Sequence, residues 1–140
     1  MNIYDKFAVR NSEVEGVWIE YPSDDDGTPG PRFKCRSANT RANKPLKLAM
    51  DAAMRRYGKS ARRGELGEEV ATKLDIARFV DHILVTWDNL LTEDGDVLVF
   101  SKENAIALFE KLPKLFDDLS DRVCDDDLFD DGIEDDEVKN

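Results

Sequence analysis

The stretch from residue 87 to residue 115 reads WDNLLTEDGDVLVFSKENAIALFEKLPKL and decides the fold of this 140-residue chain. Two acids, Glu93 and Asp94, lead into Gly95, and glycine adopts positive φ angles without a Cβ clash. The next residues, 96–100, are too few and too β-branched to form a helix. This half of the stretch therefore predicts a tight turn followed by a short extended segment.

Two consecutive helices complete the stretch. Ser101 stands at an N-cap position, where its hydroxyl can accept hydrogen bonds from free amides of the next turn. Pro113 cannot continue a helix as an interior residue but suits the first position of a new one. Each helix has an apolar face, formed by Ala105, Leu108, Phe109 and Leu112, and by Leu115, Phe116, Leu119 and Val123. We expect helices over about 102–112 and 113–124.

A long helix is predicted before this stretch. Between residues 68 and 91 the apolar residues recur every three or four positions, at Val70, Leu74, Ala77, Val80, Leu84, Trp87 and Leu91. Polar residues occupy the other side, at Lys73, Arg78, His82 and Asn89. This periodicity is typical of a helix with one broad buried face, over about 68–91.

The N-terminal part of the chain predicts a β-hairpin over about 15–37. Val17 and Ile19 alternate with more polar neighbours, and residues 32–37 alternate in the same way. The segment PSDDDGTPGP between them is rich in turn-forming residues. An isolated hairpin is only marginally stable, so we expect this one to pack on helices or to pair with another chain.

A further helix is expected over about 40–57. Asn39 or Thr40 can cap it, and Leu46, Ala49, Met50, Ala53 and Met54 would form its apolar face. Pro45 fits this helix only if the helix begins near it. Together these patterns predict a mostly helical α+β fold, with an N-terminal β-hairpin followed by about four helices.

The central stretch carries a resemblance to a known family. Its features, in order, are Trp87, the turn Glu93-Asp94-Gly95, a short apolar strand ending at Phe100-Ser101, then Glu103-Asn104-Ala105 and the break at Leu112-Pro113. This series resembles the C-terminal half of the small tail assembly chaperones of long-tailed phages. The similarity covers roughly residues 70 to 120 and is looser towards the N-terminus.

The resemblance implies a binding function in the cytoplasm of an infected host cell. Proteins of this family bind the tape measure protein and keep it soluble while the tail tube polymerises around it. By resemblance, the expected partners are the tape measure protein and the tail tube subunits, with neither ATP nor a metal involved. Self-association and a longer frameshifted product both remain open.

Charge is unevenly distributed along the chain, whose formal net charge is -11. Residues 32–63 hold eleven Lys or Arg and one Asp, a segment charge of +10. Residues 117–140 hold twelve Asp or Glu and two Lys or Arg, a segment charge of -10. The length fits one globular domain over 1–124, and the acidic composition after it predicts a flexible, disordered tail over 125–140. The two opposite charges could attract each other or meet different partners.

The residue patterns give no support to an enzyme, a metal protein or a membrane protein. Neither Cys35 nor Cys124 has a companion base or a metal-binding spacing, and His82 is the only histidine. Placing each glycine of an Asp-rich segment at position six of a calcium loop puts an apolar residue at a ligand position. No apolar run approaches the length of a membrane span. We therefore expect no catalytic residue, cofactor or metal.

Two candidate binding surfaces follow from the sequence. The first is apolar and consists of Trp87, Phe100, Phe109, Leu112 and Phe116. These side chains are most simply core, and the alternative is that some of them line a groove for a partner helix. The second is a basic docking face of Arg36, Arg41, Arg55, Arg56, Arg62 and Arg63, for which acidic segments are favoured over nucleic acid.

Two other functions remain open beside the chaperone. One is a structural tail or virion accessory subunit, in which the hairpin adds a strand to a neighbour. The other is an acidic host-takeover protein that mimics nucleic acid, although the segment charge of +10 over 32–63 does not fit such mimicry.

Overall fold

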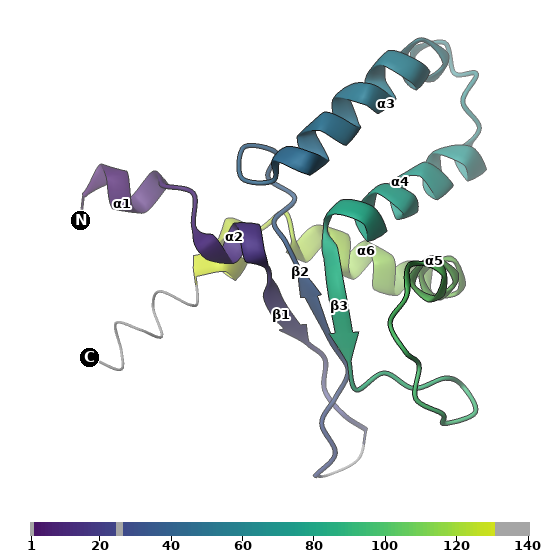
Figure 1. The fold of residues 1–140 in the computed structure, drawn as a ribbon. Helices are drawn as coiled ribbons and strands as arrows, with labels where there is room; N and C mark the ends of the chain where they lie inside the picture. The colour runs from purple at the N-terminus through teal and green to yellow at the C-terminus, as the bar shows by residue number, and fades with distance from the viewer. Residues whose placement is uncertain (1, 25–26, 131–140) are drawn as a thin grey trace.

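The computed structural model describes residues 2–24 and 27–130. Within these residues the chain forms a mixed α/β fold of six helices and one three-stranded sheet (Figure 1). In chain order the elements are α1 (Ile3–Phe7), α2 (Asn11–Glu15), β1 (Val17–Glu20), β2 (Arg32–Cys35), α3 (Lys44–Arg62), α4 (Glu68–His82), β3 (Leu84–Asp88), α5 (Lys102–Lys111) and α6 (Pro113–Arg122). The predicted fold class, mostly helical with an N-terminal hairpin, is confirmed.

The sheet is antiparallel, in the order β1-β2-β3. The predicted hairpin is its first two strands. Ile19 pairs with Phe33, and Phe33 pairs with Trp87, so these three residues form one row across the sheet. All three side chains are buried, whereas Trp18 on the other face is exposed. The alternation in the sequence therefore places one face of the sheet on the core.

The single helix predicted over 68–91 is wrong in its second half. α4 ends at His82, Ile83 caps it, and residues Leu84–Asp88 form β3. This run is β-branched and aromatic, a composition that favours strands. The open edge of β2 supplies hydrogen-bonding partners, so pairing with β2 wins over continuation of the helix. The helical spacing of Leu84 and Trp87 misled the prediction because both residues are buried in the strand as well.

The predicted bounds of the helix over 40–57 also need correction. α3 begins after Asn43, whose side chain accepts a hydrogen bond from the amide of Leu46, and Pro45 lies in its first turn. The helix does not stop at Gly58 but continues to Arg62. Gly64, with φ +69°, then supplies the left-handed conformation that follows the helix end.

The two helices predicted in the deciding stretch are confirmed as α5 and α6. The Ser101 hydroxyl accepts from the amide of Asn104 at 3.0 Å, as an N-cap should. The extended segment over 96–100 forms only one isolated bridge, between Leu91 and Val97. The indole N–H of Trp87 donates to the carbonyl of residue 98 at 2.8 Å, which fixes this loop against the sheet.

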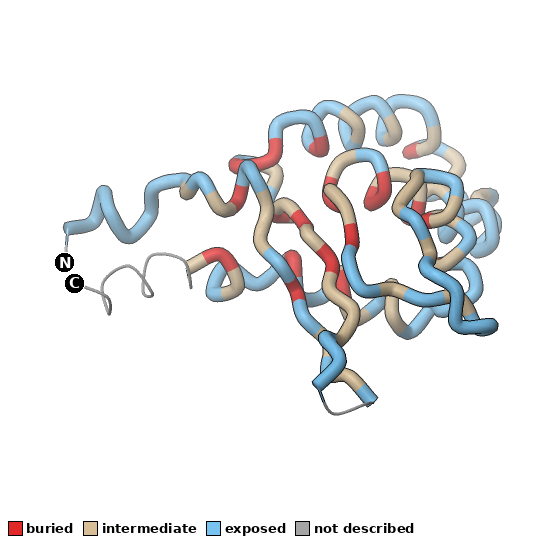
Figure 2. The backbone as a smooth tube through the Cα atoms, turned by 60° about the horizontal axis from the view of Figure 1, so that its bottom comes forward, coloured by how far each residue is buried: buried red, intermediate tan, exposed pale blue. Residues whose placement is uncertain are grey.

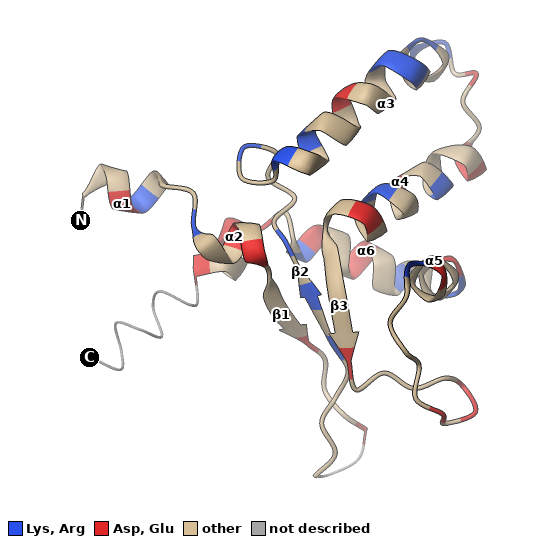
Figure 3. Cartoon of the chain, viewed as in Figure 1, with Lys and Arg blue, Asp and Glu red and all other residues tan. Residues whose placement is uncertain are grey.

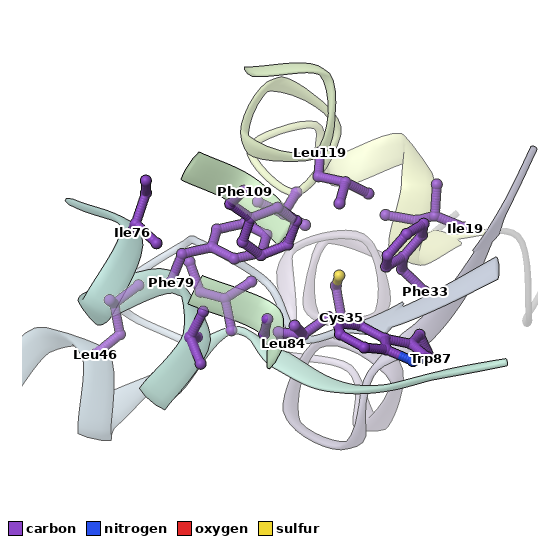
Figure 4. Close-up of a cluster of buried hydrophobic side chains, with 14 residues drawn as sticks. Ile19, Phe33, Cys35, Leu46, Ile76, Phe79, Leu84, Trp87, Phe109 and Leu119 are labelled. Carbon is purple, nitrogen blue, oxygen red and sulfur yellow. The ribbon is translucent and has the colours of Figure 1, made fainter. Parts of the chain in front are cut away.

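The core lies between the sheet and the helices. α5 packs against α4 and α6, and α3 packs against α4. Figure 4 shows Phe79 beside Phe109 at one end of the core, and Phe33 near Ile19 at the other end. Leu119 on α6 is fully buried among these side chains. One core therefore joins the hairpin to the helices of the deciding stretch.

The boundary of the domain lies beyond residue 124. Residues 126–130 form a further helical turn, and the Phe129 side chain is 0% exposed. The Ser12 hydroxyl donates to the Phe129 carbonyl at 2.6 Å, and Arg10 pairs with Asp130 at 2.8 Å. The expected flexible tail is therefore wrong for 125–130, because one aromatic ring and two contacts with the N-terminal region hold that segment. The rest of the predicted tail, 131–140, lies outside the described residues.

The first helix contributes no buried residue. Ile3, Tyr4 and Phe7 of α1 are 65–80% exposed, and Figure 2 shows the whole segment in the colour of exposed residues. In Figure 1 the N-terminal segment extends away from the sheet and the other helices.

Candidate functional site

One groove at the surface lies between α4 and the corner that joins α5 to α6. Leu112 follows the last residue of α5 with φ -118° and ψ 71°, outside the helical region, which the proline after it disfavours. Pro113 then begins α6, so the chain turns without an intervening loop. This corner brings Phe116 of α6 back against Phe109 of α5.

Three phenylalanine rings support this surface from below. Phe79 meets Phe109 edge to face, with 5.5 Å between ring centroids, and meets Phe116 in the same manner at 5.3 Å. Phe109 and Phe116 are 5.4 Å apart. Aromatic pairs at these distances stabilise one another by about 0.5–1.5 kcal/mol beyond their buried area. The interlocked rings give the surface a fixed shape rather than an adaptable one.

A groove of about 660 Å³ opens above these rings. Its apolar floor consists of Ile76 on α4 and Phe109, Pro113 and Phe116 at the corner. Ile76 and Phe109 are buried, at 2% and 1% exposed, so the half-buried Phe116 and the exposed Pro113 form the accessible apolar part of this floor.

The rim of the groove is acidic. Five acids and one lysine line it, together with Thr72: Glu68, Glu69, Asp75, Glu110, Asp117 and Lys73. Two of these acids pair with cations of α4, Glu69 with Lys73 and Asp75 with Arg78. Within residues 2–24 and 27–130, the other three carboxylates have no cationic partner. Figure 3 shows acidic positions on each of α4, α5 and α6.

The structure separates the five side chains of the predicted apolar surface. Phe109 and Phe116 line the groove, and Leu112 is exposed beside Pro113. Trp87 and Phe100 do not line it, since they pack on each other with 5.0 Å between ring centroids. Trp87 is buried as part of the core, and so is Phe109 at 1% exposed, so Leu112 and the half-buried Phe116 are the members of this set that are accessible at the corner.

The predicted basic face is divided as well. Arg36 is partly buried, and its guanidinium donates to the Val14 carbonyl at 2.9 Å. Arg41 is exposed in the loop before α3. The other four, Arg55, Arg56, Arg62 and Arg63, gather on the second half of α3 and at its end (Figure 3).

Sequence reasoning missed the acidic rim. Glu68 begins one helix, while Glu110 and Asp117 stand on either side of Pro113, so only tertiary packing brings the three together. The sequence feature that pointed to the rim is that Glu110 and Asp117 flank Pro113, with Phe109 and Phe116 next to these acids.

Two further properties bear on the kind of site. In the described part of the chain, no cluster of three His, Cys, Asp or Glu side chains is placed to hold a metal ion. Among the helices seen here, none combines the length and the apolar character needed to cross a bilayer.

The structure is thus that of a small α/β protein with a groove between α4 and the α5–α6 corner. Residues 41–140 match the family described as YdaY prophage protein. Because the match covers most of the chain, the protein belongs to this family and is phage-derived. The groove lies within the matched residues, whereas β1 and β2 precede them. No curated protein and no solved structure matches the chain.

Proposed function

We propose that this protein is a tail assembly chaperone, which binds the tape measure protein in the host cytoplasm and keeps it soluble while the tail tube forms. The observation that carries the proposal is the groove between α4 and the α5–α6 corner, with its apolar floor and acidic rim. Its membership of a prophage family and the resemblance of the central stretch to tail assembly chaperones support the same reading.

The groove favours one class of ligand, an amphipathic helix with basic residues beside its apolar face. Recognition of a helix in a groove relies on apolar anchors spaced three and four residues apart. The accessible Phe116 and Pro113 would receive those anchors, and the unpaired carboxylates of Glu68, Glu110 and Asp117 would attract flanking Lys or Arg. A tape measure protein is long, helical and apolar, so it offers many such segments.

The proposed mechanism is holding without energy input. Binding covers an apolar face that otherwise aggregates, and the affinity comes from the area removed from water. Release follows when tail tube subunits compete for the same face of the tape measure protein, because the bound and free populations follow mass action.

Co-expression with the tape measure protein tests the proposal. Wild-type chaperone should keep the tape measure protein in the soluble fraction and co-elute with it in size-exclusion chromatography. Thr72→Trp should abolish co-elution, because Thr72 is an exposed groove residue and a tryptophan there fills the groove without touching the core.

The matched control is Ala107→Trp, which adds the same ring at an exposed position of α5 outside the groove lining. This variant should retain the complex. Loss of the complex in both variants would point to a general effect of surface tryptophan. An insoluble tape measure protein beside well-folded wild-type chaperone would reject the proposal and favour a structural subunit of the virion.

A further inference from the structure

The outward face of α3 is a second surface without a partner in its own molecule. α3 packs towards α4 through Leu46, Ala49 and Ala53, which lie along one side of the helix. The opposite side presents an exposed stripe spaced three and four residues apart: Leu48, Asp51, Arg55, Lys59 and Arg62.

This face combines apolar and basic groups. Leu48 on this stripe is 70% exposed, and Met54, on the flank of the helix beside the stripe, is 64% exposed, both high values for apolar side chains. The Met54 sulfur and the Arg62 guanidinium both lie over Gly58, which has no side chain to separate them. An exposed thioether beside a guanidinium is an adaptable contact surface rather than a packed one.

The cations of this face are mostly free. α3 holds six Lys or Arg and one Asp. Lys47 pairs with Asp51, and the Arg56 guanidinium lies over the Tyr57 ring. Over the ranges 2–24 and 27–130, Arg55, Lys59 and Arg62 have no acidic partner.

α3 therefore has the properties that the acid-rimmed groove favours, an exposed helical face with apolar side chains flanked by free cations. Glu68, Glu110 and Asp117 around the groove are likewise without cationic partners in the described chain. Two α3 faces carry like charges and repel each other, and so do two acidic grooves. The basic α3 face and the acidic groove carry opposite charges and attract each other.

We propose that the outward face of α3 in one copy docks in the groove of a second copy. The contact cannot form within one molecule, because the α3 stripe points away from α4, on which the groove is built. It joins two different surfaces, so a pair of copies keeps one free groove and one free α3 face, and further copies add head to tail. This contact between copies does not require the tape measure protein. Where it has formed, a helix of another protein must displace the neighbouring copy before it can bind in the groove.

Sedimentation velocity of the purified full chain alone provides the first test. The wild-type protein should show a mass that rises with concentration at about 20 mM salt and returns to the monomer at about 500 mM, because salt screens contacts between charges. Arg55→Glu/Arg62→Glu should remain monomeric at low salt. Glu110→Lys/Asp117→Lys should also remain monomeric, since each variant places like charges on both surfaces.

Mixing the two variants gives the decisive result. In an equimolar mixture the acidic α3 of the first variant meets the basic groove of the second, and the remaining surfaces are as in the wild type. Association should therefore return on mixing. Asp24→Lys/Asp94→Lys is the matched control, because it changes the net charge as the groove variant does but at exposed loop positions, and it should associate like the wild type.

Three outcomes would overturn the proposal. One is a wild-type protein that stays monomeric at every concentration at low salt. Another is a mixture of the two variants that fails to associate. A third is binding of a short single-stranded oligonucleotide that disappears in Arg55→Glu/Arg62→Glu while the mixture stays monomeric, which would assign the α3 face to nucleic acid instead.

Discussion

At the scale of single residues, the fold depends on contacts between segments far apart in the sequence. Phe129 is fully buried although it stands among aspartates, and its carbonyl accepts from Ser12 near the other end of the chain. Composition alone predicted disorder there, because one aromatic residue carries little weight in a strongly acidic window. In the structure the turn is held by the buried Phe129 ring, by Leu128 packed against the core, and by two polar contacts with the N-terminal region.

Phe129→Ala should destabilise the protein by about 3–5 kcal/mol, the usual cost of removing a fully buried phenylalanine. Urea denaturation followed by circular dichroism measures this change. Asp127→Ala, at an exposed position of the same turn, should cost less than about 0.5 kcal/mol. A decrease of less than about 1 kcal/mol in the free energy of unfolding of Phe129→Ala would contradict the burial of this ring.

Tyr21 links the hairpin to α6 and gives a prediction about pH. Its hydroxyl donates to the Asp118 carboxylate at 2.5 Å, and this hydrogen bond lowers the pKa of Asp118 below its ordinary value. A carboxyl group with a lowered pKa adds stability above its unfolded pKa, and that stability is lost as the pH falls through the folded pKa.

Tyr21→Phe should therefore cost about 1 kcal/mol near pH 7, and the difference from wild type should narrow near pH 3. The contact of the ring with Phe33 remains in the variant. Denaturation at both pH values measures the two differences. A constant difference would mean that the loss comes from packing and not from the ionised pair.

At the scale of elements, local signals predicted the helix starts and the proline corner. Ser101 and Pro113 each affect only the first turn of the helix that they begin, so their roles could be derived from the sequence. The strand β3 could not be derived, because residues 84–88 suit a buried helix face and a buried strand equally. The choice depends on the free edge of β2, about fifty residues earlier in the chain.

Two glycines of the α3 region make a matched pair for testing the observed helix end. Gly58 lies inside α3, where alanine favours the helix by about 1 kcal/mol, and the atoms nearest to an added Cβ belong to the flexible side chains of Met54 and Arg62. Gly64 has φ +69°, which a Cβ disfavours by about 1 kcal/mol. Thermal unfolding should show Gly58→Ala stabilised and Gly64→Ala destabilised. The opposite pattern would place the helix end near Gly58, as the sequence alone indicated.

At the scale of the whole molecule, charge separation organises the surfaces. The segment charges of +10 and -10 could be counted from the sequence, but the positions of these charges on the folded surface could not be derived from it. Folding concentrates the free cations on the outer side of α3 and places the free acids around the groove of α4, α5 and α6. Helices distant in sequence build the groove, so its acidic rim could not be predicted from spacing.

Hydrogen exchange on the complex with the tape measure protein tests whether the groove is the binding site. We expect the amides of residues 68–76 and 109–117 to exchange more slowly in the complex than in the free protein, with little change in α1 and the hairpin. Protection confined to residues 2–24 and 27–40, or protection spread evenly over the chain, would contradict it.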